Sequence, residues 1–243
     1  MNQGEYGIVN TEHIKQSPLS GRNVQGVCYG GLEKMRKSFC VVVVVLVSVL
    51  LFSAGLSEQS AAYGAGRMKS VYIPDKQVSI AVPEDYIVYA KDDQDIDSRL
   101  VSIGITKESL QDMMQQNRIV LTAYNPDLKS DTINAGISDS AIEDLNLLDQ
   151  DLVQKLLDRM VEELSNVGFS VTGKEVLSIN DMLMISTKSE LTANPNQKNI
   201  QYFTIYDHQT IVITMTVYDG IITPEDEALL KTAVECSSLK KGK

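Results

Sequence analysis

Four consecutive stretches near the C-terminus alternate apolar and polar residues with a period of two. This alternation is the pattern of a half-buried β-strand. Because only short turns separate the stretches, neighbouring strands are expected to pair antiparallel as hairpins. The predicted strands are residues 169–179, 183–189, 200–207 and 210–218. They constrain the fold most, because such a sheet must bury at least one face against helices or a second sheet.

The clearest helix is predicted over residues 150–167, where apolar residues recur at three- and four-residue spacing. Asp149 is placed to cap its start, and Gly168 stands where a left-handed residue is favoured at its end. A second helix is expected after Thr223, which is followed by a proline and then by acidic residues.

The segment before the long helix contains a shorter predicted helix over residues 107–117, with Thr106 as its cap. Further strands are predicted over residues 70–73, 77–82, 119–124 and 132–137. The predicted order is β-β-α-β-β-α-β-β-β-β-α. Hairpin-linked strands with segregated helices indicate an α+β fold, an antiparallel β-sheet with helices packed on it.

An apolar run at residues 39–56 separates this domain from the N-terminal part of the chain. As a helix, its 18 residues would extend about 27 Å. The hydrocarbon core of a bilayer is about 30 Å thick, so the near match favours a transmembrane anchor. Arg36 and Lys37 precede the run, and Ser60 and Ala62 could mark a cleavage site, so a secretory signal peptide is the alternative. Both place the downstream domain outside the cytoplasm.

The chain therefore divides into three predicted parts. Residues 1–34 are polar and aperiodic and are expected to be an unstructured leader. A glycine pair shortly before Met35 can be encoded by a ribosome-binding sequence, so Met35 is predicted to be the true initiator. Residues 35–65 are the signal peptide or anchor with its linker, and residues 66–243 are a single extracytoplasmic α+β domain.

This predicted domain is acidic and contains one cysteine. Residues 66–243 hold 17 Lys and Arg against 28 Asp and Glu, a net charge of −11. Such a surface repels phosphate backbones, so no nucleic-acid binding is expected. The expected membrane contact is through residues 39–56 if that segment is uncleaved. Cys236 has no second domain cysteine for a disulfide and is expected on the apolar face of the last helix.

The domain resembles a known family at both of its ends. The opening VSIAVPEDYIVYA and the ending YFTIYDHQTIVITMTVYDGIITPEDEALLKTAVECSSL resemble the PsbP-like fold, which includes the extrinsic oxygen-evolving protein of photosystem II and bacterial relatives. The likeness extends to uncharacterised exported proteins of Firmicutes and covers about residues 70–238. It implies an accessory, non-catalytic domain that binds other proteins. No family binding residue can be matched here.

No residue of the domain is predicted to be catalytic, cofactor-binding or metal-binding. His208 lies in a predicted hairpin turn, and residues 66–243 contain no second histidine that could complete a metal site. The sequence also lacks an HExxH, CxxC, GxSxG, P-loop or dinucleotide fingerprint.

An acidic run over residues 92–97 invites a calcium interpretation. Asp93, Asp95 and Asp97 match the first ligand positions of an EF-hand loop. The match fails further along, because Ser98 replaces the required glycine and a glycine stands where the bidentate glutamate belongs. A solvated, self-repelling loop is expected instead.

Aromatic residues gather near the last hairpin, and alternation places Tyr202 and Tyr206 on one face and Phe203 on the other. Together with Tyr218 they are interpreted as cross-strand packing, with a binding surface as the alternative.

The sequence as a whole predicts a non-enzymatic, membrane-tethered or exported accessory module that acts through contact with another protein. The alternatives are an extracytoplasmic ligand or calcium sensor and a hydrolase with an unrecognised site.

Overall fold

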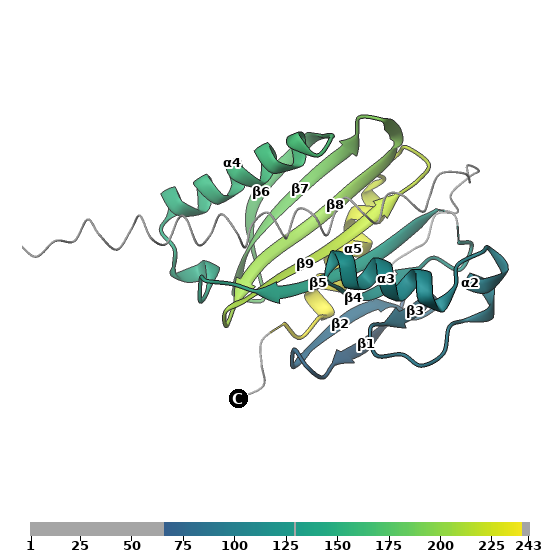
Figure 1. The fold of residues 1–243 in the computed structure, drawn as a ribbon. Coiled ribbons are helices and arrows are strands. Elements are labelled where there is room, and N and C mark those ends of the chain that lie inside the picture. Colours follow the sequence, from purple (N-terminus) through teal and green to yellow (C-terminus); the bar gives the residue numbers. More distant parts are fainter. Residues whose placement is uncertain (1–65, 129, 240–243) are drawn as a thin grey trace, which may run out of the picture.

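A seven-stranded antiparallel sheet forms the centre of the structure (Figure 1). The computed structural model describes residues 66–128 and 130–239. The strand order is β3-β4-β5-β9-β8-β7-β6, so the last strand of the chain is inserted at the middle of the sheet, between β5 and β8. The strands are β3 Ile87–Ala90, β4 Ile119–Tyr124, β5 Asp131–Asp139, β6 Phe169–Ile179, β7 Met182–Leu191, β8 Asn194–Tyr206 and β9 Gln209–Val217.

A separate two-stranded hairpin precedes this sheet. Strand β1 Met68–Ile73 pairs antiparallel with β2 Val78–Pro83. The helical elements are α2 Ser98–Ser102, α3 Lys107–Asn117, the 3-10 helix η2 Leu145–Leu147, α4 Gln150–Asn166 and α5 Pro224–Cys236.

Local sequence explains where the helices begin and end. The side chains of Thr106 and Asp149 accept from Ser109 N and Leu152 N at the starts of α3 and α4. Thr223 and Asp226 form a reciprocal capping box at the start of α5. Gly168 follows the end of α4 with a φ of +92°, a conformation that costs glycine little.

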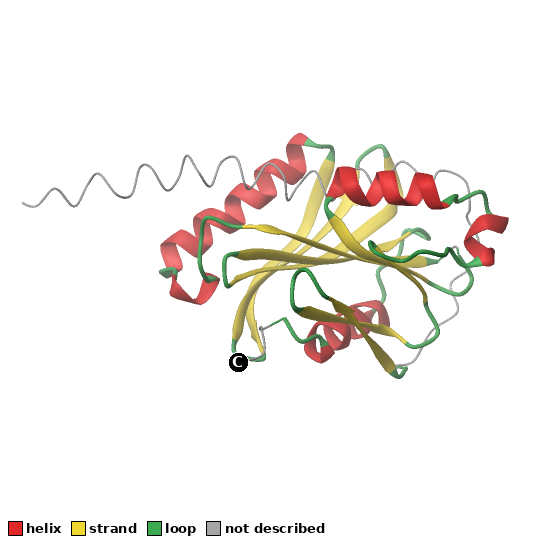
Figure 2. Ribbon diagram, turned by 60° about the horizontal axis from the view of Figure 1, so that its bottom comes forward, coloured by secondary structure: helices red, strands yellow, loops and turns green. Residues whose placement is uncertain are grey.

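The sheet is covered on both faces, which gives a three-layered domain (Figure 2). On one face lie the β1–β2 hairpin and α5. On the other face α4 covers one edge and α3 covers the opposite edge.

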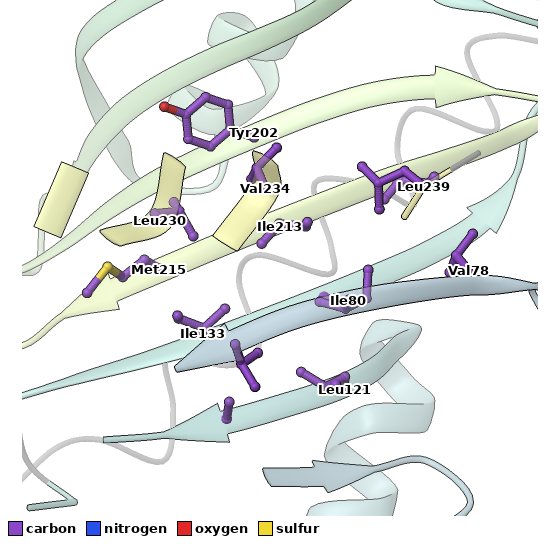
Figure 3. Packing of buried hydrophobic residues seen from close by; sticks show 14 of the residues in the cluster. Val78, Ile80, Leu121, Ile133, Tyr202, Ile213, Met215, Leu230, Val234 and Leu239 are labelled. Atoms are coloured by element: carbon purple, nitrogen blue, oxygen red, sulfur yellow. The ribbon is translucent and has the colours of Figure 1, made fainter. Parts of the chain in front are cut away.

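Alternation along the strands divides the buried apolar residues between these layers. The largest cluster lies between the sheet and the layer of the hairpin and α5, and includes Ile80, Ile133, Ile213, Met215 and Leu230 (Figure 3). A second cluster joins α4 to Ile185, Phe203 and Val212, and a third joins α3 to Tyr89 and Ile119.

The predicted α+β class and the long helix are confirmed. The predicted order missed β3 and the short helix α2, because four and five residues are too few for a clear periodic pattern. Strand β8 begins at Asn194, six residues before the predicted start at Ile200.

The expectation for Cys236 was wrong. Cys236 is the last residue of α5 and its side chain is exposed, because the apolar side of the helix is formed by residues such as Leu230 and Val234. The predicted leader and the predicted signal peptide or anchor lie outside the described residues. Among the helices of residues 66–128 and 130–239, none is long and apolar enough to cross a membrane.

Candidate functional site

The acidic run forms the connection between β3 and α2. Asp93 Oδ2 accepts a hydrogen bond from Ala90 N at 2.7 Å. Asp97 caps α2 through Arg99 N and also binds the Arg99 guanidinium at 2.8 and 3.0 Å. These hydrogen bonds hold the pKa of the Asp97 carboxyl at about 2. Two of the three EF-hand-like aspartates are thus engaged in local hydrogen bonds.

His208 and Asp207 form the turn between β8 and β9, as predicted, with φ values of +58° and +49°. Two consecutive residues with positive φ are typical of the tight turn that suits a twisted hairpin. The His208 N–H donates to Glu143 O, and its own carbonyl accepts from Ser140 N. The backbone of His208 therefore joins this turn to the segment between β5 and η2.

The aromatic residues alternate as predicted. Tyr202 belongs to the cluster beneath α5, and Phe203 to the cluster beneath α4. Tyr206 is partly buried, and the hydroxyl of Tyr218 lies 3.2 Å from Thr132 Oγ1. Tyr202 and Phe203 therefore pack in the interior, one on each face of the sheet.

A pocket of about 360 Å³ opens where β1 begins and β2 ends. Its lining includes Arg67, Glu84, Tyr86 and Leu229. Beside it, Lys69 Nζ donates to the carbonyl oxygens of Glu84 and Tyr86 at 2.9 and 2.7 Å. Burial is the largest cause of the lowered pKa of Lys69.

A buried cluster of hydrogen-bonded side chains around the carboxyl group of Asp131 adjoins this pocket. Asp131 Oδ1 accepts from the Tyr86 hydroxyl, while its Oδ2 accepts from Asn125 Nδ2 at 2.9 Å and Ser130 Oγ at 3.3 Å. Burial raises the pKa of Asp131 to about 6. The pKa of Tyr86 is also raised, mainly by burial and secondly by the negative charge of the nearby Asp131. Both carboxyl oxygens are satisfied within the domain, so the arrangement fixes the β4–β5 connection against the segment that leads into β3.

The feature that most resembles a binding site is a set of buried polar side chains on one face of the sheet. This face carries α3 and α4, and α5 lies on the opposite face. Strand register aligns these polar side chains in two rows across β5, β9, β8 and β7. We call them the polar strip. The first row is Asn134, Thr214, Gln201 and Thr187, and the second row is Thr132, Thr216, Asn199 and Ser189.

The polar strip lies between the two helices of that face. Phe203 and Val212, which pack under α4, continue the same face two residues along β8 and β9 from Gln201 and Thr214. On the other side, Tyr124 packs with the α3 cluster and pairs with Thr132. The strip therefore separates two apolar clusters, and neither row contains a charged residue.

Several amides of this region have unused hydrogen-bonding groups. Each strip side chain is at least nine-tenths buried. Within the described residues, Asn134 Oδ1, Asn199 Oδ1 and Gln201 Nε2 have no hydrogen-bond partner, and the same holds for Gln197 Nε2 further along β8. Burying a polar group without a partner costs about 1–3 kcal/mol, so such groups are rare in native proteins.

The alternation of polar residues was visible in the sequence, but the strip was not predicted. The predicted strand began at Ile200, so residues 194–199 were not placed in the sheet. From sequence alone, a polar face of a strand is also interpreted as solvent-exposed, because the sequence does not show which helices flank it. A signal was nevertheless present in the alternating amides Gln197, Asn199 and Gln201.

The architecture is that of an α+β domain with helices on an antiparallel sheet, and a PsbP is among the solved structures to which it is similar. The structure is similar to the solution structure of cyanobacterial PsbP from Synechocystis, with 9% identity and a TM-score of 0.44. That similarity covers 75% of this chain and 97% of the other.

A second similar structure is a Pseudomonas aeruginosa protein of unknown function described as a putative regulator. It has 12% identity and a TM-score of 0.30, over 70% of this chain and 96% of the other. No family model matches the sequence, and no curated protein is significantly similar to it. At these identities the likeness concerns the fold and does not extend to function.

Proposed function

We propose that this protein is a non-enzymatic accessory module that is tethered to or exported across a membrane and acts by binding another protein outside the cytoplasm. The observation that carries the binding role is the polar strip with its buried, unpaired amides. A ligand that supplies the missing hydrogen bonds would offset a cost that the domain bears without it.

The chemistry of the strip supports binding rather than reaction. Its amides and hydroxyls donate and accept hydrogen bonds at neutral pH but do not ionise there. General acid–base or nucleophilic catalysis requires a group whose proton or electron pair is available near neutral pH. Asp131, whose pKa is raised to about 6, is bonded to Tyr86 and Asn125 on the side of β5 that faces α5, away from the strip.

Export is supported by the apolar run of residues 39–56 and the preceding Arg36 and Lys37. A domain with a net charge of −11 would also be kept away from anionic headgroups and nucleic acids. Such a module would meet its partner near the membrane surface without adhering to lipid.

The test is chemical crosslinking in intact cells that produce the tagged full-length protein. The parent is compared with Asn199→Leu and Gln201→Leu, which change strip amides, and with Gln115→Leu, which changes an exposed glutamine of α3. A discrete adduct is expected with the parent and Gln115→Leu and should be strongly reduced with both strip variants. Equal adduct yields from all four proteins would contradict a binding role for the strip.

A further inference from the structure

The pocket between the start of β1 and the end of β2 is apolar inside and charged at its rim. Its volume of about 360 Å³ is within the range of ligand sites. The buried residues of its lining are Pro83, Tyr86 and Leu229, and the exposed ones are Gly66, Arg67, Glu84 and Asp85. Tyr86 and Leu229 also belong to the largest apolar cluster, so the pocket is an opening at the edge of the core.

The charged residues of this rim form no ion pairs within residues 66–128 and 130–239. None of the salt bridges there involves Arg67, Glu84 or Asp85. The nearby Lys69 donates to the carbonyl oxygens of Glu84 and Tyr86 and not to a carboxylate. Among the described residues, the two rim carboxylates are therefore open to a cation that a partner supplies.

Acidic groups predominate around the pocket. Behind it lies the buried Asp131, whose pKa is raised by burial and further by the charges of Asp226 and Asp127. Together with the two rim carboxylates, these acids outnumber Arg67 and Lys69, the cations of this region. The domain as a whole has a net charge of −11. The pocket therefore favours cationic partners over anionic ones.

The wall and the rim of the pocket select different parts of a ligand. An apolar group that fills the pocket is removed from water, which contributes about 25 cal/mol per Å². A metal ion or a small hydrophilic cation would pair with the rim but leave the apolar wall in contact with water. An uncharged apolar ligand would leave the rim carboxylates unpaired. A polypeptide segment with a large apolar side chain beside lysine or arginine satisfies both parts.

We propose that this pocket binds a segment of a partner protein in which a leucine-sized apolar side chain is flanked by lysine or arginine. The apolar side chain enters the pocket and contacts Tyr86 and Leu229, and the flanking cations pair with Glu84 and Asp85. The pocket lies on the face of the sheet that carries the hairpin and α5, so it is a second surface, separate from the polar strip. The inference goes beyond the proposed function because it specifies the chemistry of a partner segment.

The direct test uses two capped pentapeptides with a neutral dye, Gly-Lys-Leu-Lys-Gly and Gly-Lys-Ser-Lys-Gly, and the full-length protein in nanodiscs of uncharged lipid. Fluorescence anisotropy measures both affinities. The leucine peptide is expected to bind about 10-fold more tightly or better, because burial of a leucine side chain contributes about 1.5–3 kcal/mol. Both measurements use the same protein, so the comparison does not depend on its stability.

The rim is tested with the double variant Glu84→Lys/Asp85→Lys, which changes two exposed side chains. It should bind the leucine peptide about 5-fold more weakly or worse, because two ion pairs are replaced by repulsions. The matched control Asp112→Lys/Glu162→Lys changes the net charge equally, at exposed positions of α3 and α4 on the opposite face of the sheet. At about 0.15 M salt it should bind within about twofold of the parent, since charges beyond about 8 Å are largely screened.

A third measurement locates the bound side chain. The leucine peptide, with a photoreactive diazirine analogue at its leucine, should label the protein at residues 83–86 or at Leu229, as mapped by mass spectrometry. Labelling elsewhere, an absence of binding, equal affinities of the leucine and serine peptides, or equal losses in the rim variant and its control would overturn the proposal. Crosslinking of the strip variants tests the proposed function separately, because the strip lies on the opposite face of the sheet.

Discussion

At the scale of single residues, the buried polar groups of the domain are of two kinds, those with all their hydrogen bonds made and those with an atom that lacks a partner. Asp131 has both carboxyl oxygens hydrogen-bonded, by Tyr86, Asn125 and Ser130. Asn199 and Gln201 are as deeply buried, yet each has an amide atom without a partner in the described part of the chain. The first arrangement stabilises the end of a strand, and the second leaves buried polar atoms whose desolvation no hydrogen bond offsets.

Asp131 gives the folded domain a defined pH dependence. Burial, reinforced by the acidic neighbours Asp226 and Asp127, raises its folded pKa to about 6 from the ordinary value of 3.8. A raised folded pKa means that protonation favours the folded state. The contribution is fully present below the unfolded pKa and is lost as the pH rises through about 6. Between pH 5 and pH 8 this loss amounts to about 1.4 kcal/mol.

We therefore expect Asp131→Asn to remove this part of the pH dependence. The free energies of unfolding of the parent and the variant, measured by urea denaturation at pH 5 and pH 8, should differ in their pH change by about 1.4 kcal/mol. Any constant cost of the substitution cancels in this comparison. The variant should be relatively more stable at pH 8, and an unchanged pH profile would show that Asp131 does not titrate in this range.

The acidic run makes a second prediction at the residue scale. With Asp93 bonded to Ala90 N and Asp97 to Arg99, we expect no calcium-dependent change in melting temperature at 1 mM free ion. A site with a dissociation constant of about 10 µM would instead stabilise the domain by about 2.7 kcal/mol, a shift of several degrees. A shift that disappears in Asp93→Asn/Asp95→Asn would establish a calcium site here.

At the scale of elements, the sequence predicted those with strong local signals. Helix α4 was placed to within one residue of its observed end because its apolar spacing, its Asp149 cap and Gly168 agree. Strand β3 and the first part of β8 were missed because short or polar strands are specified by their neighbours rather than by their own residues.

The polar strip could not be predicted for a related reason. Its rows depend on the pairing of β5 with β9, strands whose aligned residues Asn134 and Thr214 are far apart in the sequence. Burial of the strip is a property of the assembled domain and not of any one strand. Sequence alternation can show that Asn199 and Gln201 share a face, but not which side chains lie beside them.

Helix α4 provides the stability prediction at this scale. Leu156 and Leu157 are 1% and 4% exposed and pack on the sheet beside Phe203 and Val212. We expect replacement of either leucine by alanine to lower the free energy of unfolding by about 2–5 kcal/mol. Urea denaturation measures the loss, with Lys155→Ala on the exposed side of the same helix as the control. Unchanged midpoints for both leucine variants would mean that α4 does not cover this core.

At the scale of the whole molecule, the proposed binding role of the polar strip would assign stability and recognition to different layers. The hairpin and α5 close one face of the sheet over the largest apolar cluster. On the opposite face α3 and α4 each cover one edge, with the polar strip between them. A substitution in the first layer should act mainly through folding, whereas a strip substitution should change binding with little loss of stability.

The topology of the full-length chain gives the last prediction. Arg36 and Lys37 before the apolar run of residues 39–56 should keep the N-terminal side in the cytoplasm and place the acidic domain outside. External protease added to intact cells should therefore remove a C-terminal tag while a cytoplasmic control protein stays intact. The double variant Arg36→Glu/Lys37→Glu removes the positive charges that set this orientation and should leave a larger fraction of the tag protected. A tag that is fully protected in cells with the parent protein would place the domain in the cytoplasm and exclude a partner on the outer side.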